Sequence, residues 1–313
     1  MANCNILFKK FSQELNITPT KLSGLMDSKD SIREKVKNYF KDKHPSYKPK
    51  FWIQGSYKMK TMIRTKYDTC DLDDGVYFQS NPDNVSAETL QTWVENAVSN
   101  ITQDVSHRKK CITINYKGDY SIDLPIYLFD EEKDEHPSLA IKENGFREDD
   151  PKEMVSAFKN KKNTNDQLLR IVRYLKAWCD YKREKMPSGL AMTILVMNNI
   201  QFNYRDDIAL KYTLIEIQKV LKNKFECIVP ATPFDDIFSD FTIERKNNFL
   251  SNLDDFVSDA KKAIDEKNQL KASNLWKKHL GDRFPDGDDK DETSDIDNIK
   301  KIATKSTPYA RRW

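Results

Sequence analysis

The sequence has no long hydrophobic run and few cysteines for its 313 residues. No stretch approaches the roughly 18 to 20 apolar residues that a membrane span needs, and the opening MANCNILFKKFSQEL becomes charged too soon for a signal peptide. The five cysteines are scattered and none has C-x-x-C spacing, which argues against a disulfide framework or a cysteine zinc site. We therefore expect a cytoplasmic protein in a reducing compartment, without membrane contact.

Two common catalytic signatures are also missing. No G-x-x-x-x-G-K-[ST] sequence is present, and the four histidines are isolated, so neither a P-loop nor a histidine-based hydrolase has support. The net charge of +3 is too small for a protein that coats polyanions. The acidic stretch DGDDKDETSD makes the rest of the chain more basic than that value suggests. A basic body suits phosphate-bearing partners, but solvated surface lysines explain it equally well.

Hydrophobic periodicity predicts mixed α and β structure in the first half of the chain. Period-two alternation and turn residues indicate strands, and apolar residues spaced by three and four indicate helices. The expected elements are helices at 29–43 and around 90–101, strands at 50–54 and 71–78, and a hairpin of 111–116 and 120–129 turning at Gly118.

From about residue 164 the pattern becomes mostly helical. The expected helices cover 164–185, 189–200, 207–222, 247–265 and 269–280. We therefore expect an α+β fold of two lobes with a cleft between them, which suits the length. The expected parts are a core with N-terminal helices at 1–160, a helical lobe at 161–285, and an acidic flexible tail at 286–313, with a polar link around 131–165.

The strand predicted at 71–78 carries two acids on one face. Asp71 and Asp73 alternate with Leu72, so their carboxylates project the same way, about 7 Å apart along the strand, close enough to share a pair of divalent ions. Asp74 points to the opposite face, and Asp68 ends the preceding loop or joins the site. Hard oxygen ligands favour Mg²⁺ or Mn²⁺.

Asp123 is the best candidate for a third carboxylate. It stands between Ile122 and Leu124 in an apolar run, where an aspartate is costly unless it is paired or bound to metal. The alternative is that Asp123 caps a turn or meets a lysine.

The step Gly55-Ser56 precedes these acids and suits an anion. Glycine lets backbone N–H groups approach a phosphate, and serine adds a hydroxyl. Lys58, Lys60 and Arg64 follow and could steer a triphosphate. Alone the dipeptide is an ordinary turn; the combination of strand, Gly-Ser, D-x-D strand and later strand aspartate carries the signal.

This combination resembles the nucleotidyltransferases of the polymerase beta superfamily, whose pattern is a hydrophobic residue, G-S, a spacer and D-h-D-h. Two features depart from it: Gln54 stands at the hydrophobic position, and fourteen residues separate Ser56 from Asp71, slightly more than in many members. With IDLPIY, LLRIVRYLKAW and GDRFP later in the chain, the string QGSYKMKTMIRTKYDTCDLDDGVYF resembles the bacterial cGAS/DncV-like nucleotidyltransferases, the CD-NTases of anti-phage CBASS systems. The likeness covers roughly residues 30 to 285 and implies a polymerase beta-like core.

The resemblance assigns roles by matching position. Asp71 and Asp73 would hold two Mg²⁺ ions, with Mn²⁺ as a substitute, and Asp123 would bind the ion that activates the attacking ribose hydroxyl. The implied nucleotide-binding residues are Gln54, Gly55, Ser56, Lys58, Arg64, Lys176 and Ser188. For two of them an alternative stays open, because Lys176 could snorkel beside Trp178 and Ser188 could cap a helix.

The resemblance also implies the reaction and the partners. The enzyme would use ATP and/or GTP, release pyrophosphate and make a purine-containing cyclic dinucleotide such as cyclic di-GMP, sensed by a downstream effector protein in anti-phage signalling. Animal cyclic GMP-AMP synthase senses DNA through a zinc-binding insertion, and no Cys/His cluster exists here to build one, so we expect no DNA requirement. The alternatives are a nucleotidyltransferase that modifies RNA, protein or a small molecule, and a catalytically silent nucleotide-binding module.

Overall fold

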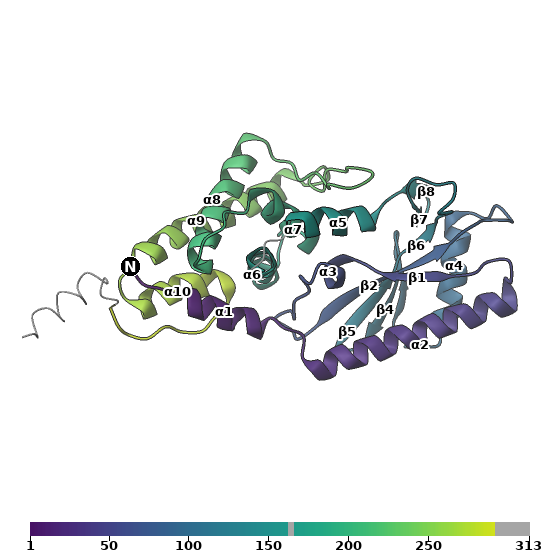
Figure 1. The fold of residues 1–313 in the computed structure, drawn as a ribbon, viewed down its shortest axis with the longest axis horizontal. Coiled ribbons are helices and arrows are strands. Elements are labelled where there is room, and N and C mark those ends of the chain that lie inside the picture. The colour runs from purple at the N-terminus through teal and green to yellow at the C-terminus, as the bar shows by residue number, and fades with distance from the viewer. Residues whose placement is uncertain (162–165, 292–313) are drawn as a thin grey trace, which may run out of the picture.

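The computed structural model describes residues 1–161 and 166–291, which form two lobes (Figure 1). One lobe is built on an eight-stranded mixed sheet, and the other is helical. The strands are β1 (Lys50–Ile53), β2 (Cys70–Phe78), β3 (Val105–His107), β4 (Ile112–Tyr116), β5 (Tyr120–Leu124), β6 (Ile126–Leu128), β7 (Ser138–Ile141) and β8 (Gly145–Glu148).

Strand β2 is the centre of the sheet. β1 pairs with it antiparallel, while β5 and β6 both pair with it in parallel. Asp73 lies opposite Asp123 and Tyr77 opposite Tyr127, so β5 and β6 keep one register along β2 and are a single line interrupted at Pro125. The strand expected at 120–129 is therefore present, split where proline cannot donate a ladder hydrogen bond.

Two helices cover one face of this sheet. They are α2 (Pro19–Lys43) and α4 (Ala87–Val98), and their apolar residues share one core with Leu72, Val76 and Phe78 of β2. Helix α2 begins at Pro19, ten residues before the expected start, because Thr18 caps it and proline favours the first helical position. The alternation predicted for β2 is confirmed: Asp71 and Asp73 line the cavity, on the face away from α2, whereas the even-numbered residues pack toward α2.

The helical lobe has a core rich in aromatic residues. Trp178, Trp276 and Phe256 are fully buried there, and their rings lie in contact. The expected helices in this half are confirmed within a few residues at their ends. They are α6 (Gln167–Lys182), α7 (Gly189–Asn199), α8 (Asp206–Asn223), α9 (Ile243–Asp265) and α10 (Gln269–Leu280).

Two helices from before residue 161 also pack in this core. Helix α1 (Asn5–Glu14) places Phe8 against Tyr174 and Trp276, and α5 (Pro151–Lys161) contributes Phe158. The hydrophobic cores therefore assign both segments to the helical lobe, although the expected core spans 1–160. Apolar side chains on α1 find their partners far along the chain, which local patterning does not reveal.

The polar stretch expected to link the halves is built from regular structure. It contains the strands β7 and β8 and the helix α5. Strand β7 pairs with β6, and β8 pairs with β7, so the two strands complete one edge of the sheet. The first residues of the acidic segment, 286–291, are hydrogen-bonded to the start of α10; Gly287 N donates to Ser273 Oγ. The rest of the predicted tail, 292–313, lies outside the described residues. Within the described ranges, no helix is both long and apolar enough to cross a bilayer.

Candidate active site

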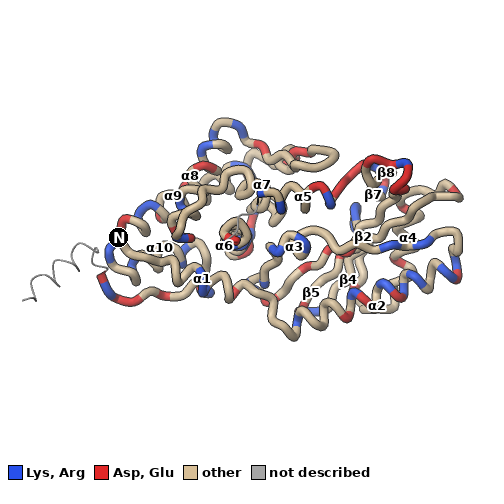
Figure 2. The backbone as a smooth tube through the Cα atoms, viewed as in Figure 1, with Lys and Arg blue, Asp and Glu red and all other residues tan. Residues whose placement is uncertain are grey.

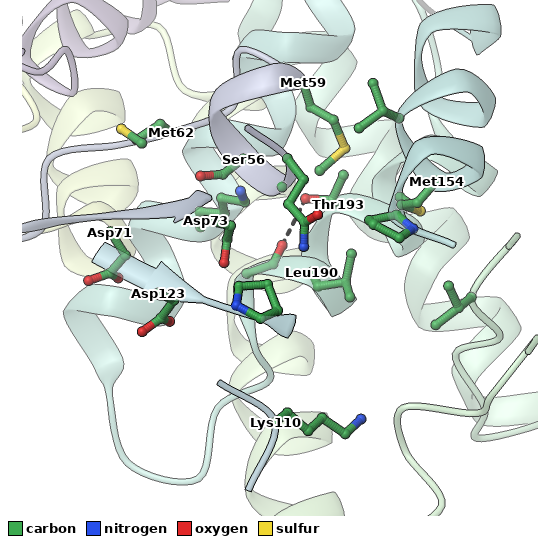
Figure 3. A pocket seen from close by; sticks show the side chains of 18 of the residues that line it. Ser56, Met59, Met62, Asp71, Asp73, Lys110, Asp123, Met154, Leu190 and Thr193 are labelled. Atoms are coloured by element: carbon green, nitrogen blue, oxygen red, sulfur yellow. Dashed lines mark hydrogen bonds between the residues drawn. The ribbon is translucent and has the colours of Figure 1, made fainter. Parts of the chain in front are cut away.

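Three aspartates come together where β2 and β5 run side by side. Asp73 and Asp123 are direct partners in the parallel register, and Asp71 lies two residues earlier on β2 (Figure 3). Ser121 Oγ donates to Asp71 Oδ1 at 2.6 Å, and Thr113 Oγ1 donates to Asp123 Oδ1 at 2.5 Å. The convergence of the acids on one face, predicted from the sequence, is confirmed, and neighbouring hydroxyls orient two of the three carboxylates.

Burial and mutual repulsion both disfavour the ionised forms of these acids in the metal-free chain. Burial, Asp123 and Asp71 together raise the pKa of Asp73 to about 6, against the pull of Lys176. Burial also raises the pKa of Asp123, although its hydrogen bond from Thr113 opposes this. Carboxylates that repel one another in this way bind cations readily.

Glycine is required immediately before Ser56. Gly55 has φ +60°, and a Cβ on it would lie 2.0 Å from Asp73 Oδ2. Helix α3 (Gly55–Lys58) begins here, so its first N–H groups lie next to the acids. Gln54 precedes it with a buried side chain, which donates to Tyr127 OH at 3.2 Å and accepts from Tyr77 OH at 3.1 Å. Gln54 stands where the superfamily pattern has a hydrophobic residue, and the hydroxyls of two tyrosines satisfy the hydrogen bonding of its buried amide.

The acids open onto a cavity of about 760 Å³ between the lobes. Its floor is the face of the sheet, and its opposite wall comes from α5, α6 and α7. This volume is in the range of small-molecule sites. The predicted site residues that line it are Gln54, Gly55, Ser56, Asp71, Asp73, Asp123 and Lys176.

Lys176 reaches the cavity from α6. Its ammonium donates to Thr61 O at 3.2 Å and Thr61 Oγ1 at 3.1 Å. Burial lowers the pKa of Lys176 to about 8, and the charge of Asp73 opposes that shift. Ser188 does not line the cavity; its Oγ accepts from Ala191 N at 3.2 Å and caps α7, as the alternative prediction held.

The basic residues that follow Ser56 point away from the cavity. Lys58 lies over the ring of Trp52 at 5.6 Å, and Arg64 donates to Glu14 O at 3.0 Å. Lys60 is exposed. None of the three lines the cavity, so the structure does not place Lys58 or Arg64 where the sequence predicted them. Lys58 and Arg64 make local contacts instead.

The two ambiguous acids have structural partners. Asp74 is completely buried and takes two hydrogen bonds from Arg33 of α2, at 2.7 and 2.5 Å. Asp68 lies in the loop before β2 with φ +61°, and its carboxylate forms ion pairs with Lys21 and Arg64. Neither lines the cavity.

Sequence reasoning missed several residues that line the cavity. Lys110, Asp149 and Arg183 bring charge to the cavity, and Lys110 lies well away from the three acids in Figure 3. Four methionines, at 59, 62, 154 and 186, provide flexible apolar surface. These residues come from four separate stretches of the chain, 59–62, 110, 149–154 and 183–186, so no local motif signals them.

The donor set fits divalent metal ions. Three carboxylates on one face offer only oxygen ligands, and the raised pKa of Asp73 shows that a cation would relieve repulsion. Asp71 is exposed and lines the cavity, so its carboxylate is accessible to an ion.

Part of the chain matches a known family model. Residues 49–127 match the family model "Cyclic GMP-AMP synthase DncV-like, nucleotidyltransferase domain". A cyclic GMP-AMP synthase of Escherichia albertii is 28% identical over 192 residues, which are 56% of this chain. The match spans less than half of that relative, 42% of its length.

Solved structures of DncV share the fold. The cyclic AMP-GMP synthase DncV of Vibrio cholerae superposes with a TM-score of 0.79 at 16% identity, covering 91% of this chain and 98% of that one. Its complex with the linear intermediate 5′ pppA(3′,5′)pG gives 0.80 at 16% identity, covering 91% and 97%. DncV of Escherichia coli, with 3′-deoxy GTP bound, gives 0.73 at 17% identity, covering 87% and 93%. The resemblance to bacterial cGAS/DncV-like nucleotidyltransferases and the expected α+β fold class are thus confirmed.

Proposed function

Since residues 49–127 match a DncV-like nucleotidyltransferase domain and the chain has the corresponding fold, we propose that this protein is a metal-dependent nucleotidyltransferase. It joins purine nucleoside triphosphates into a cyclic dinucleotide and releases pyrophosphate. The observation that supports this most directly is the placement of Asp71, Asp73 and Asp123 on one face, at the edge of a cavity large enough for nucleotides.

The chain's residues divide the work. Asp71 and Asp73 would hold two Mg²⁺ ions, or Mn²⁺ in their place, and Asp123 would share one of them. Gly55 and Ser56 bring backbone N–H groups and a hydroxyl to the triphosphate, and Lys176 faces its negative charge from the other lobe. The bound ions would lower the pKa of the attacking ribose hydroxyl and offset charge at the α-phosphate.

Thr113 and Ser121 keep the carboxylates in place during the reaction. Each donates a short hydrogen bond to one aspartate oxygen and leaves the other oxygen available to an ion. Gly55 allows the triphosphate loop to approach Asp73 closely. This arrangement supports catalysis by positioning and charge, which is how nucleotidyl transfer works in general.

The names of the relatives favour a mixed product. Relatives are called cyclic GMP-AMP or cyclic AMP-GMP synthases, and one DncV structure holds an intermediate containing both adenosine and guanosine. We therefore propose ATP and GTP together as substrates, with cyclic di-GMP as the competing product. We propose that the product acts in the cytoplasm on a downstream effector protein in anti-phage signalling, and that synthesis needs no DNA.

The test is product analysis with purified protein, Mg²⁺ and labelled ATP and GTP. A cyclic dinucleotide has no terminal phosphate, so we expect a small phosphatase-resistant species, with two pyrophosphates released per ring. Asp73→Asn should give none, and Asp42→Asn, which changes an exposed acid on α2, should give as much as the unchanged protein.

Other outcomes would point to other functions. Label that stays phosphatase-sensitive would indicate a linear product, and label on RNA, protein or a small molecule would indicate another superfamily reaction. Nucleotide binding without pyrophosphate release would indicate a silent binding module.

A further inference from the structure

A second cluster of metal-ligating side chains includes Asp150, which lines the cavity. His136, from the loop before β7, meets Asp150 and Glu153 at the start of α5. One ligand atom from each residue lies within 4.8 Å of the other two, and in the ranges 1–161 and 166–291 no other trio of His, Cys, Asp or Glu meets this condition. The cluster plays no part in the function proposed above.

The distances within the cluster suit a shared ion better than direct hydrogen bonds. His136 Nδ1 lies 3.5 Å from Asp150 Oδ2 and 3.7 Å from Glu153 Oε1. A good N–H···O bond has about 2.7 to 3.2 Å between its heavy atoms. Ligands around a tetrahedral Zn²⁺ with bonds of 2.0 to 2.2 Å stand roughly 3.3 to 3.6 Å apart.

Each member is oriented by its other polar atom. His136 Nε2 lies 3.3 Å from Thr232 Oγ1, and Thr232 N donates to Glu153 Oε2 at 2.7 Å. Asp150 Oδ1 caps α5 by accepting from the backbone N of Lys152 and Glu153. These contacts leave Nδ1, Oδ2 and Oε1, which lie within 4.8 Å of one another, available to a shared ion. Outer-shell partners orient ligands in this way at metal sites.

His136 Nδ1 is the atom that needs a cation. It is buried and has no hydrogen-bond partner in the part of the chain that the structure describes. If Nε2 donates to Thr232, the lone pair on Nδ1 faces two carboxylates, an arrangement that is costly without a positive charge between them. Aspartate and glutamate residues are concentrated around β8 and the start of α5, and their negative charge would attract a cation (Figure 2).

We propose that His136, Asp150 and Glu153 form a binding site for a divalent transition-metal ion of the Zn²⁺ type. One imidazole and two carboxylates suit such an ion, and a fourth position stays open to water because Glu153 is partly exposed. The site joins the sheet lobe to the helical lobe, since His136 stands just before β7, whereas Asp150 and Glu153 stand at the start of α5 and Asp150 N donates to Thr232 O. Its role is to hold the cavity wall formed by Asp150 and Thr232.

The test is zinc binding by the full chain after chelator treatment. Equilibrium dialysis is run with millimolar Mg²⁺ present, so that the three catalytic-face aspartates are occupied. We expect one Zn²⁺ per chain, and an anomalous peak at the zinc edge beside His136 in a crystal. Thr232→Val should weaken binding about 10- to 100-fold, since it removes one orienting hydroxyl.

Matched variants separate this site from others. His136→Gln keeps a group near Thr232 Oγ1 but removes Nδ1, and it should weaken binding more than Thr232→Val does. His107→Gln, which alters a histidine 2.9 Å from the carboxylate of Glu95 in the same lobe, should bind as the unchanged protein does. If His136→Gln does not fold, Glu153→Gln gives the same test, because its amide oxygen can still accept from Thr232 N.

Two results would overturn the proposal. One is the absence of stoichiometric zinc. The other is zinc that binds equally well in Thr232→Val and Glu153→Gln or scatters elsewhere, which would make the cluster an ordinary imidazolium–carboxylate contact.

Discussion

Asp73 and Asp74 are neighbours on β2, but their side chains lie on opposite faces of the strand and have opposite electrostatic environments. Asp74 faces α2, is fully buried and is neutralised by the paired hydrogen bonds of Arg33. Asp73 faces the cavity between two other acids, and burial beside them raises its pKa to about 6. One carboxylate is satisfied by the fold, and the other is left for a ligand.

This difference separates stability from function within two residues. A buried carboxylate with its own arginine stabilises the packing of α2 on the sheet. The three carboxylates on the other face form no ion pair within residues 1–161 and 166–291, and their repulsion destabilises the metal-free chain. Sites that bind ions commonly carry such a cost. Changes on the two faces should therefore act on different measurements.

The largest effect is expected from Asp73→Asn. Removing a ligand of both proposed ions should lower turnover by at least about a thousandfold, since ion stabilisation is worth several kcal/mol. The melting temperature without divalent ions should stay the same or rise, because repulsion falls. Pyrophosphate release and a thermal scan measure both, and a strongly lowered melting temperature would make Asp73 structural.

Arg33→Met tests the face of β2 that packs against α2, because it removes both hydrogen bonds to Asp74. It leaves Asp74 buried without its partner, so we expect the free energy of unfolding to fall by about 3 to 5 kcal/mol, measured with urea. Adding Asp74→Leu should recover most of that loss, because an apolar pair suits the site. Turnover of the folded fraction should stay near that of the unchanged protein; parallel losses of turnover would contradict the separation of the two faces.

Gly55→Ala tests the approach of the glycine loop to Asp73. A Cβ would lie 2.0 Å from Asp73 Oδ2 and displace the carboxylate, so turnover should fall about a hundredfold. Gly118→Ala is the matched control, since Gly118 also has positive φ, at +76°, but its Cβ would meet nothing within 4 Å. If Gly55→Ala and Gly118→Ala have equal turnover, the effect comes from backbone strain at a positive φ and not from contact between the added Cβ and Asp73.

The smallest effect is a pH dependence of stability. The raised pKa means that the folded, metal-free chain holds the proton on Asp73 up to about pH 6, while the unfolded chain loses it near 4. Ionisation therefore costs the folded state, and the free energy of unfolding should fall as pH rises through this window. Asp73→Asn should lack this part of the curve in urea titrations, whereas identical curves would remove the repulsion argument.

Part of this site could be predicted from sequence because strand periodicity is local. Alternation along 71–78 places Asp71 and Asp73 on one face. Asp123 lies beside them because β5, the second strand of the hairpin turning at Gly118, pairs in parallel with β2. The same reasoning left Asp74 unexplained, because Arg33 lies on a helix some forty residues earlier.

The remaining errors have a common cause. Lys58 and Arg64 follow Ser56 closely, but their side-chain directions depend on Trp52 and on the end of α1. The packing of α1 in the helical lobe likewise depends on Tyr174 and Trp276, which contact Phe8 only once the chain has folded. Contacts between distant segments are not encoded in local periodicity.

The central claim is that the Asp73 face of β2 holds metal ions for nucleotidyl transfer and the Asp74 face does not. The most direct measurement is anomalous diffraction from a crystal soaked with Mn²⁺ and a non-hydrolysable nucleoside triphosphate. The account predicts two manganese peaks, about 3.5 to 4 Å apart, beside Asp71, Asp73 and Asp123, with the triphosphate against Gly55 and Ser56. A bound nucleotide whose metal ions lie away from these three carboxylates would contradict it.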